Sequence, residues 1–200
     1  MIIEKITFEK KEYIIRFSNK QAVNIVEDTL VKFNLYKGAE VPDDFDKILF
    51  YEDQLIRSYN LSCRYLTNLK SSNEVRTYLL KKDVPIDIIE KTLDLLEEKG
   101  FLDDYNYAVL YIHDAQKLKK YGQNKIKYSL QQKGIDKVII NEAMDEIDFD
   151  LEYENIKILL KNKIKEDYSY KSINKAVRFL LGRGYNYSMI KDALNEEKDS

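Results

Sequence analysis

Apolar residues recur at helical spacing in residues 124–144, and the same pattern returns twice elsewhere in the chain. Ile126 and Leu130 lie four residues apart, which is the spacing of one face of an α-helix. Residues 174–194 match this stretch without a gap at six of 21 positions, and residues 73–93 match it at five. The apolar positions superpose in three sets: Val75, Ile126 and Ala176; Leu79, Leu130 and Leu180; Ile89, Ile140 and Ile190.

A period of about 50 residues in apolar pattern predicts a repeat protein, in which each unit buries its apolar face against its neighbours. We expect three helices in each of three such units, which are the repeats of this chain. The expected ranges are 53–69, 75–82 and 87–99; 103–120, 124–133 and 136–147; 151–166, 171–181 and 188–196. The acidic stretch 145–154 is interpreted as a linker between the second and third units.

The first 52 residues follow a different pattern. Runs rich in β-branched and aromatic residues at 2–8, 13–17 and 22–26 predict a hairpin and a third strand. Two short helices are expected after them, one at 29–35 and one beginning near Pro42. The fold class is therefore mainly α, with three tandem three-helix repeats in an elongated curved array and a small β-containing N-terminal element. The expected domain ranges are 1–52, 53–101, 102–149 and 150–200.

Composition narrows the setting without naming a partner. With 33 basic and 35 acidic residues, the chain is nearly neutral, and 44% of its residues are hydrophobic, enough for a core. It contains no apolar run of 18 residues and a single cysteine, and its first 17 residues alternate apolar and charged side chains. We therefore expect no membrane span, no signal peptide and a reducing cytoplasm as the location.

The distribution of charge is more informative than its sum. Residues 115–135 hold six lysines and no acid, 155–165 hold four more lysines, and 168–191 hold five basic residues and no acid. One such block is typical of a solvated helix surface, but its recurrence around the middle helices of two units favours an anionic partner. The predicted binding residues are Lys70, Arg76, Lys119, Lys120, Lys125, Lys127, Lys175, Arg178 and Arg183.

Candidate catalytic groups have simpler interpretations. The pair Asp103-Asp104 follows Gly100 closely, which is typical of a helix end and the cap of the next helix. His113 and Cys63 are single residues without a nearby ligand or activating group in the sequence. We therefore expect no enzymatic activity, no cofactor and no metal site.

The paired helices of each unit leave an alternative open. A helix-turn-helix transcription regulator would insert a polar recognition helix into the major groove of duplex DNA. The third helices of the units are instead apolar over a broad face, which favours stacking. A plain protein scaffold, indifferent to nucleic acid, is a further alternative.

Several short stretches follow the order seen in the RecX regulators of the RecA recombinase, and the chain most resembles the Gram-positive version with an N-terminal extension. They are TLVKFNLYKG at 29–38, RYL at 64–66, EVRTYL at 74–79, EKGFLDD at 98–104, YA at 107–108 and KGI at 133–135. The family usually has Arg-Ser or Arg-Thr before the first Glu-Val, where this chain has Lys70-Ser71-Ser72.

This resemblance implies an all-helical array of three-helix repeats that lies along the RecA filament on single-stranded DNA. It implies modulation of filament assembly, strand exchange and coprotease activity. It also implies direct binding to single-stranded DNA, and to duplex DNA without sequence preference. We expect a monomer that contacts no membrane.

Overall fold

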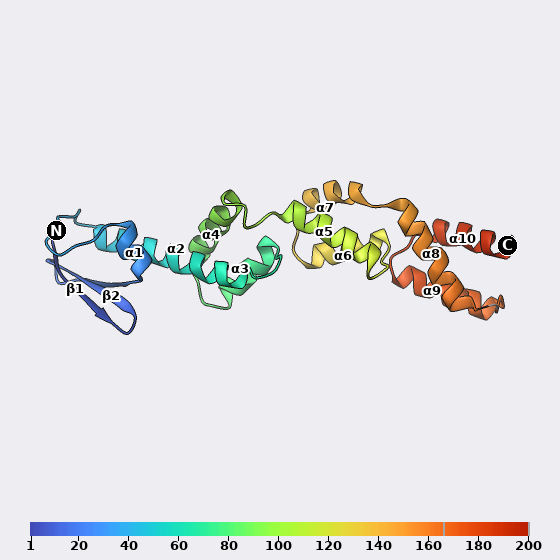
Figure 1. The fold of residues 1–200 in the computed structure, drawn as a ribbon, viewed down its shortest axis with the longest axis horizontal. Helices are drawn as coiled ribbons and strands as arrows, with labels where there is room; N and C mark the ends of the chain where they lie inside the picture. Colours follow the sequence, from blue (N-terminus) through green and yellow to red (C-terminus); the bar gives the residue numbers. More distant parts are fainter. Residues whose placement is uncertain (166, 200) are drawn as a thin grey trace. The chain divides into compact units, whose positions relative to one another are not determined.

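A computed structural model describes residues 1–165 and 167–199, and its contacts divide the chain into two compact units (Figure 1). Unit 1 comprises Met1–Leu69 and Val75–Leu102, and unit 2 comprises Lys70–Glu74 and Asp103–Ser200. Within the described residues, the expected mainly helical fold with a small N-terminal sheet is confirmed.

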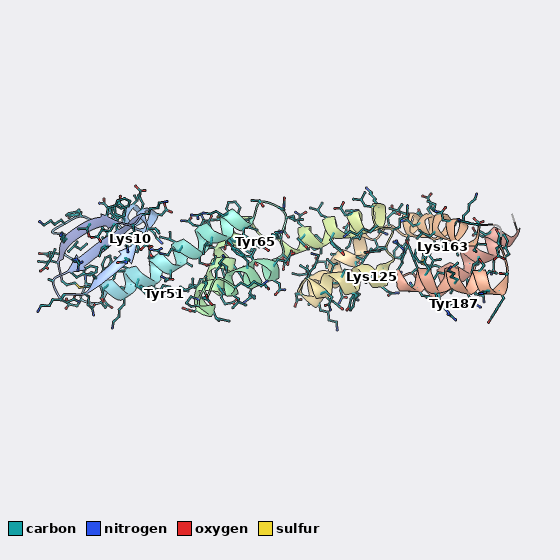
Figure 2. All side chains as sticks on the ribbon, turned by 90° about the horizontal axis from the view of Figure 1, so that it is seen from below. Lys10, Tyr51, Tyr65, Lys125, Lys163 and Tyr187 are labelled. Atoms are coloured by element: carbon teal, nitrogen blue, oxygen red, sulfur yellow. The ribbon has the colours of Figure 1, made fainter. Side chains whose placement is uncertain are left out.

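The N-terminal sheet consists of β1 (Ile3–Glu9), β2 (Glu12–Phe17) and β3 (Ala22–Ile25), paired antiparallel in that order. The expected hairpin is confirmed: Glu9 pairs with Glu12, and both lysines of the turn, Lys10 (labelled in Figure 2) and Lys11, adopt positive φ. Two positive φ angles give the turn the twist that tight hairpins require. Alternate residues of β2 and β3 face the core, so period-two patterning forms the sheet.

Two helices follow the sheet, α1 (Glu27–Lys32) and α2 (Phe45–Tyr65). The second short helix expected near Pro42 is the first half of α2, which continues through the expected boundary at residue 52. Its N-terminal half buries Leu49 in the sheet's core. Farther along, the Ser58 side chain receives a 2.8 Å hydrogen bond from Thr92. One helix therefore serves two cores.

Asp53 explains why α2 continues without a break. Its buried carboxylate accepts hydrogen bonds from the Val26 amide at 2.8 Å and the Thr29 hydroxyl at 2.6 Å. The guanidinium of Arg57, one turn later, pairs with the same carboxylate and with Glu12. These partners compensate a charge whose burial would otherwise be costly, and they attach the middle of the helix to the sheet.

The first repeat is completed by α3 (Ser72–Leu80) and α4 (Ile86–Glu98), which bury Val75, Leu79 and Ile89. Gly100 follows α4 with φ +71°, and the Asp103 carboxylate caps the next helix by accepting from the Asn106 amide. The helix-boundary interpretation of the 100–104 segment is therefore confirmed.

Unit 2 contains the other two repeats. The second has α5 (Asp104–Lys117), α6 (Gln123–Gln132), α7 (Lys137–Ala143) and a short 3-10 helix η1 (Met144–Glu146). The third has α8 (Phe149–Ile164), α9 (Tyr170–Gly182) and α10 (Tyr187–Asp199). The expected end of the first helix of this repeat, residue 166, lies outside the described residues. All nine superposed apolar positions of the three repeats are fully buried, as the repeat pattern predicts.

The prediction of a linker at 145–154 is wrong. This stretch forms η1 and the first turn of α8, whose cap is Asp148. The side chain of Gln116 bonds both backbone groups of Asp148, donating to its carbonyl at 2.9 Å and accepting from its amide at 3.2 Å. Glu152 is fully buried. Acids in this stretch therefore cap and anchor a helix start, where the helix dipole favours negative charge.

Candidate nucleic-acid interface

The basic and acidic blocks of the sequence lie largely on different helices. The middle helices of the second and third repeats, α6 and α9, contain lysine and arginine but no aspartate or glutamate. Acids lie instead on the flanking α7, η1, α8 and α10. Within unit 2, α6 and α9 lie along one side and α7 and α10 along the other (Figure 1). We call α6 and α9, which contain basic but no acidic residues, the basic side of unit 2.

Two of the predicted cations pair within their own repeats. Arg76 on α3 forms a bidentate ion pair with Glu90 on α4, one of its bonds measuring 2.7 Å. Lys127 on α6 donates to the Asn141 side chain on α7 at 2.9 Å. Both pairs join the second helix to the third across 14 residues of sequence. They occupy equivalent positions, so these cations help to set the angle between the helices of each repeat.

Arg183 lies in the turn between α9 and α10, which packs on the segment before α6. Its guanidinium donates to the carbonyl oxygens of Lys119 and Lys120, the latter at 3.2 Å. It also lies over the rings of Tyr121 and Phe179, 5.7 and 5.1 Å from their centroids. A planar cation suits both carbonyl binding and ring stacking. Arg183 therefore holds the second and third repeats together.

Backbone groups complete this contact. The Gly122 amide donates to the Arg183 carbonyl at 2.9 Å, and the Asn124 amide donates to the Gly184 carbonyl at 3.1 Å. Amides at the start of α6, from its N-cap Gly122 and from Asn124, thereby meet carbonyls just after α9, so polar backbone groups near two helix ends pair with each other. Gly184 has φ +89°, and a Cβ there would lie 2.2 Å from the Lys125 amide nitrogen. The close approach therefore requires glycine.

A buried carboxylate on α8 also bonds the start of α6, beside the turn that follows α9. Glu152 accepts from the Gln123 amide, the first residue of α6, at 2.9 Å through Oε1. No described group bonds its other oxygen, and burial raises the pKa of this carboxyl. Beside it, the Lys120 ammonium donates to Asn155 at 2.7 Å, and the Asn155 amide donates to the Gln116 carbonyl at 3.0 Å.

The same arrangement recurs where residues 70–74 pack within unit 2. The Lys133 carbonyl, in the turn between α6 and α7, accepts from Ser71 Oγ at 3.1 Å and from the Asn73 side chain at 3.3 Å. Asp104 accepts from the Ser72 amide at 2.8 Å, as Glu152 does at the start of α6. A following turn and a following carboxylate therefore meet the start of a middle helix in both places.

Ser71 and Glu74 form a capping box at the start of α3, each side chain accepting from the other residue's amide, at 3.2 and 3.0 Å. Partial burial disfavours the charged form of the Glu74 carboxyl, but the bond from the Ser71 amide, the Lys133 charge, the Tyr107 hydroxyl and, most weakly, the Lys70 charge lower its pKa. The structure thus places the Lys70 charge beside the start of α3.

The remaining predicted cations lie at the surface of the basic side. The ammonium of Lys119 lies 4.9 Å from the ring centroid of Tyr111, and that of Lys125, labelled in Figure 2, lies 5.4 Å from that of Tyr128. A concavity of about 460 Å³ opens at the start of α9. It is lined by Tyr170, Lys171, Asn174, Lys175 and Arg178.

Residues selected by charge alone omitted Lys171 and the tyrosines. Tyr170 is 85% exposed and Tyr128 53% exposed, although both are large aromatic residues. A usable signal was present in the sequence, because tyrosines alternate with basic residues before and within both acid-free blocks. Exposed aromatic side chains beside cations are what single-stranded nucleic acid requires for base stacking.

Other chemistry is sparse in the described residues. No cluster of three or more His, Cys, Asp and Glu side chains suited to a metal ion occurs at 1–165 or 167–199. His113 and Cys63 are half-buried. Over the same residues, no helix is both long and apolar enough to cross a membrane. The third helix α7 has seven residues and buries Ile140 and Ala143, so it contributes mainly to the core.

Comparison with known proteins gives one consistent match. Residues 103–144 match the family model described as RecX, second three-helix domain. A regulatory protein RecX of Clostridium botulinum (strain Eklund 17B / Type B) is 39% identical over 194 residues, covering 89% of this chain and 91% of the relative. One of Clostridium tetani (strain Massachusetts / E88) is 33% identical, covering 94% and 88%.

Solved structures agree with the sequence matches. The crystal structure of a regulatory protein RecX superposes with a TM-score of 0.78 and 25% identity, covering 96% of this chain and 98% of that chain. RecX from Lactobacillus salivarius superposes with a TM-score of 0.68 and 28% identity, covering 72% of this chain and 97% of that chain.

Proposed function

Because the chain belongs to the RecX family of regulatory proteins, we propose that it binds the filament that RecA forms on single-stranded DNA. It modulates the assembly of this filament and its recombinase and coprotease activity. It acts as a monomer in the cytoplasm and needs no cofactor. The observation that carries the proposal beyond the family is the basic, acid-free side of unit 2, because such a surface attracts the phosphates of the filament's DNA.

The nine basic residues selected from the sequence divide into two groups under this proposal. Lys119, Lys125, Lys175 and Arg178 lie at the surface and contact the filament directly, Lys125 more weakly because it is half-buried and lies over the Tyr128 ring. The others interact within the protein, Lys70 through its charge on Glu74, and contribute by shaping the surface and by adding to its positive potential. These are Lys70, Arg76, Lys120, Lys127 and Arg183.

The test is RecA-dependent ATP hydrolysis on single-stranded DNA, with and without the protein. We expect a clear change in rate at micromolar protein, and unchanged hydrolysis would overturn the proposal. Charge reversal at Lys119, Lys125, Lys175 and Arg178 together should abolish the effect. Reversal at four exposed lysines outside α6 and α9, Lys81, Lys99, Lys137 and Lys191, changes the net charge equally and serves as the matched control. Equal loss in both variants would show that only net charge matters.

A competition assay separates this proposal from a transcription regulator. Under our proposal, single-stranded DNA competes well for the protein, and random duplex competes as well as any chosen duplex sequence. A strong preference for one duplex sequence would favour a helix-turn-helix reader instead.

A further inference from the structure

The concavity at the start of α9 has a chemical character unlike the rest of the basic side. Lys171, Lys175 and Arg178 follow one another at spacings of four and three residues, which aligns them on one face of the helix. Tyr170, 85% exposed, lies at the same end of the helix. The concavity, about 460 Å³ in volume, is therefore lined by three cations, the Asn174 amide and an aromatic ring.

This stripe of like charges is unfavourable in the isolated protein. Like charges at i, i+4 destabilise a helix, and none of the ion pairs among residues 1–165 and 167–199 involves Lys171, Lys175 or Arg178. The nearest described acid before the helix is Asp167, and its carboxylate accepts a 3.0 Å bond from the Ser169 amide. An anionic ligand would relieve the repulsion.

The equivalent surface in the second repeat is covered by protein. There the turn between α9 and α10 occupies the start of α6, and the Gly122 amide bonds the Arg183 carbonyl. In the third repeat, α9 begins at Tyr170, three residues earlier than the alignment with α6 predicts. The amide of Ser172, which aligns with Gly122, donates to Ser169 Oγ at 3.3 Å. The amide that would receive a further turn is therefore already bonded.

A second copy of the chain is also a poor occupant. Its exposed turn would be the one between α3 and α4, where Asp83 stands in the position of Gly134 and Gly184. A Cβ at Gly184 would lie 2.2 Å from the Lys125 amide nitrogen, so a turn carrying aspartate cannot approach a middle helix in the same way. The helix start in the third repeat is thus open to a ligand other than another repeat.

We propose that this concavity is a single-strand nucleic-acid subsite, in which Tyr170 stacks on a base while Lys171, Lys175 and Arg178 contact the flanking phosphates. Asn174 supplies a hydrogen bond to a base edge or sugar. The inference rests on the proposed function and locates the DNA-contacting part of the basic side. Since every base has a face on which a ring can stack, the subsite tolerates any sequence.

The test measures binding of the full-length protein to a fluorescently labelled oligothymidylate by anisotropy, without RecA. Tyr170→Ala should weaken binding about tenfold, because stacking of one base is lost, and Tyr170→Phe should restore most of it. The control Tyr187→Ala, which removes another exposed tyrosine (61% exposed) at the start of α10, should change binding less than twofold. Neutralising Lys171, Lys175 and Arg178 to Gln should lower the salt slope by about two units.

Three outcomes overturn the subsite. Tyr170→Ala binding as tightly as wild type shows that no base stacks there. Equal loss for Tyr170→Ala on oligothymidylate and on an abasic strand of the same length shows that the ring does not act through a base. If the triple Gln variant keeps its affinity for oligothymidylate but loses its effect on RecA, the surface contacts an acidic protein face instead. Unchanged RecA hydrolysis with wild type fails the proposed function alone, because the anisotropy assay contains no RecA.

Discussion

The N-terminal parts of α6 and α9 align with each other in two successive repeats, yet their surface residues have different roles. Tyr121, Asn124 and Lys125 lie where the following turn packs, and the structure uses their backbone and rings for that contact. The aligned residues of α9 are Lys171, Asn174 and Lys175, which line the concavity and receive no such turn from the part of the chain that the structure describes. Basic residues at aligned positions therefore differ in role. Where a turn of another repeat packs on them they stabilise the fold, and where none does they can bind a partner.

The difference follows from the position of each repeat in the array. An inner repeat has to receive the next one, so glycines and backbone amides gather at its contacts. The third repeat receives no such turn from residues 1–165 and 167–199, and its open helix start is basic and aromatic. A surface that only ended a stack of repeats would need to be polar and no more, so these side chains favour binding.

The largest expected effect comes from filling the close approach at Gly184. Gly184→Ala should lower the free energy of unfolding of unit 2 by about 3 kcal/mol, because it adds a strained positive φ to a clash with the backbone of Lys125. Urea unfolding followed by circular dichroism measures the loss. Hydrogen exchange should place it in α6 and α9.

Gly182→Ala is the matched control. This glycine lies two residues earlier, inside α9, and a Cβ there would meet nothing within 4 Å. Alanine should therefore stabilise the helix by up to about 1 kcal/mol. If both alanine variants shift stability alike, the turn between α9 and α10 does not pack on α6 as described.

The next largest effect on stability is expected from replacing Arg183, compared with replacing Arg178. Arg183→Gln should cost about 1–2 kcal/mol of unfolding free energy, because two carbonyl bonds and two ring contacts are lost. Arg178→Gln should leave stability within about 0.5 kcal/mol, since Arg178 is exposed, and should weaken binding to single-stranded DNA. Thermal unfolding and anisotropy of both variants separate the roles. The reverse pattern would contradict our assignment.

These two arginines also mark what the sequence alone can predict. The apolar period predicts the three repeats and their buried positions, because helix faces and core residues follow local rules of spacing. Arg178 and Arg183 lie in one acid-free block of 168–191 and are indistinguishable by charge. Their roles differ because one lies beneath a carbonyl-bearing segment about 60 residues away, and no local pattern encodes that contact.

Other differences from the predictions have the same origin. The acids of 145–154 suggested a linker by composition, but Asp148 and Glu152 bond helix starts that belong to different helices. The continuous α2 was missed because Asp53 resembles a helix boundary until its partners Val26 and Thr29 are known. Polar residues carry structural roles through distant partners, whereas apolar periods carry theirs locally.

A smaller effect is expected at Glu152, the buried carboxyl of the α6 contact. Burial raises its pKa in the folded protein, so the folded state holds this proton more tightly than the unfolded chain does. The carboxylate therefore costs stability above its folded pKa, and the cost disappears as pH falls below its ordinary value near 4.5. Glu152→Gln keeps an acceptor for the Gln123 amide and should raise the unfolding free energy by about 1 kcal/mol at pH 7.

Urea unfolding at pH 7 and near pH 4 checks this prediction. The advantage of the glutamine variant should be present at the higher pH and absent at the lower. Glu154→Gln, two residues further along α8 and exposed, should show neither the gain nor its pH dependence. A variant less stable than wild type at pH 7 would mean that the negative charge at the start of α6 outweighs its burial.

The smallest expected effect compares the two aligned lysines of the middle helices. Lys175→Gln should lower the slope of log affinity against log salt for single-stranded DNA by about 0.7, the value expected when one phosphate contact is lost. Lys125→Gln should lower it by less than half as much. The Lys125 ammonium lies over the Tyr128 ring and its backbone is packed against Gly184, which leaves it less able to approach a phosphate. Equal slopes for the two variants would mean that the strand contacts both helices. The covered start of α6 would then bind the strand as strongly as the open start of α9.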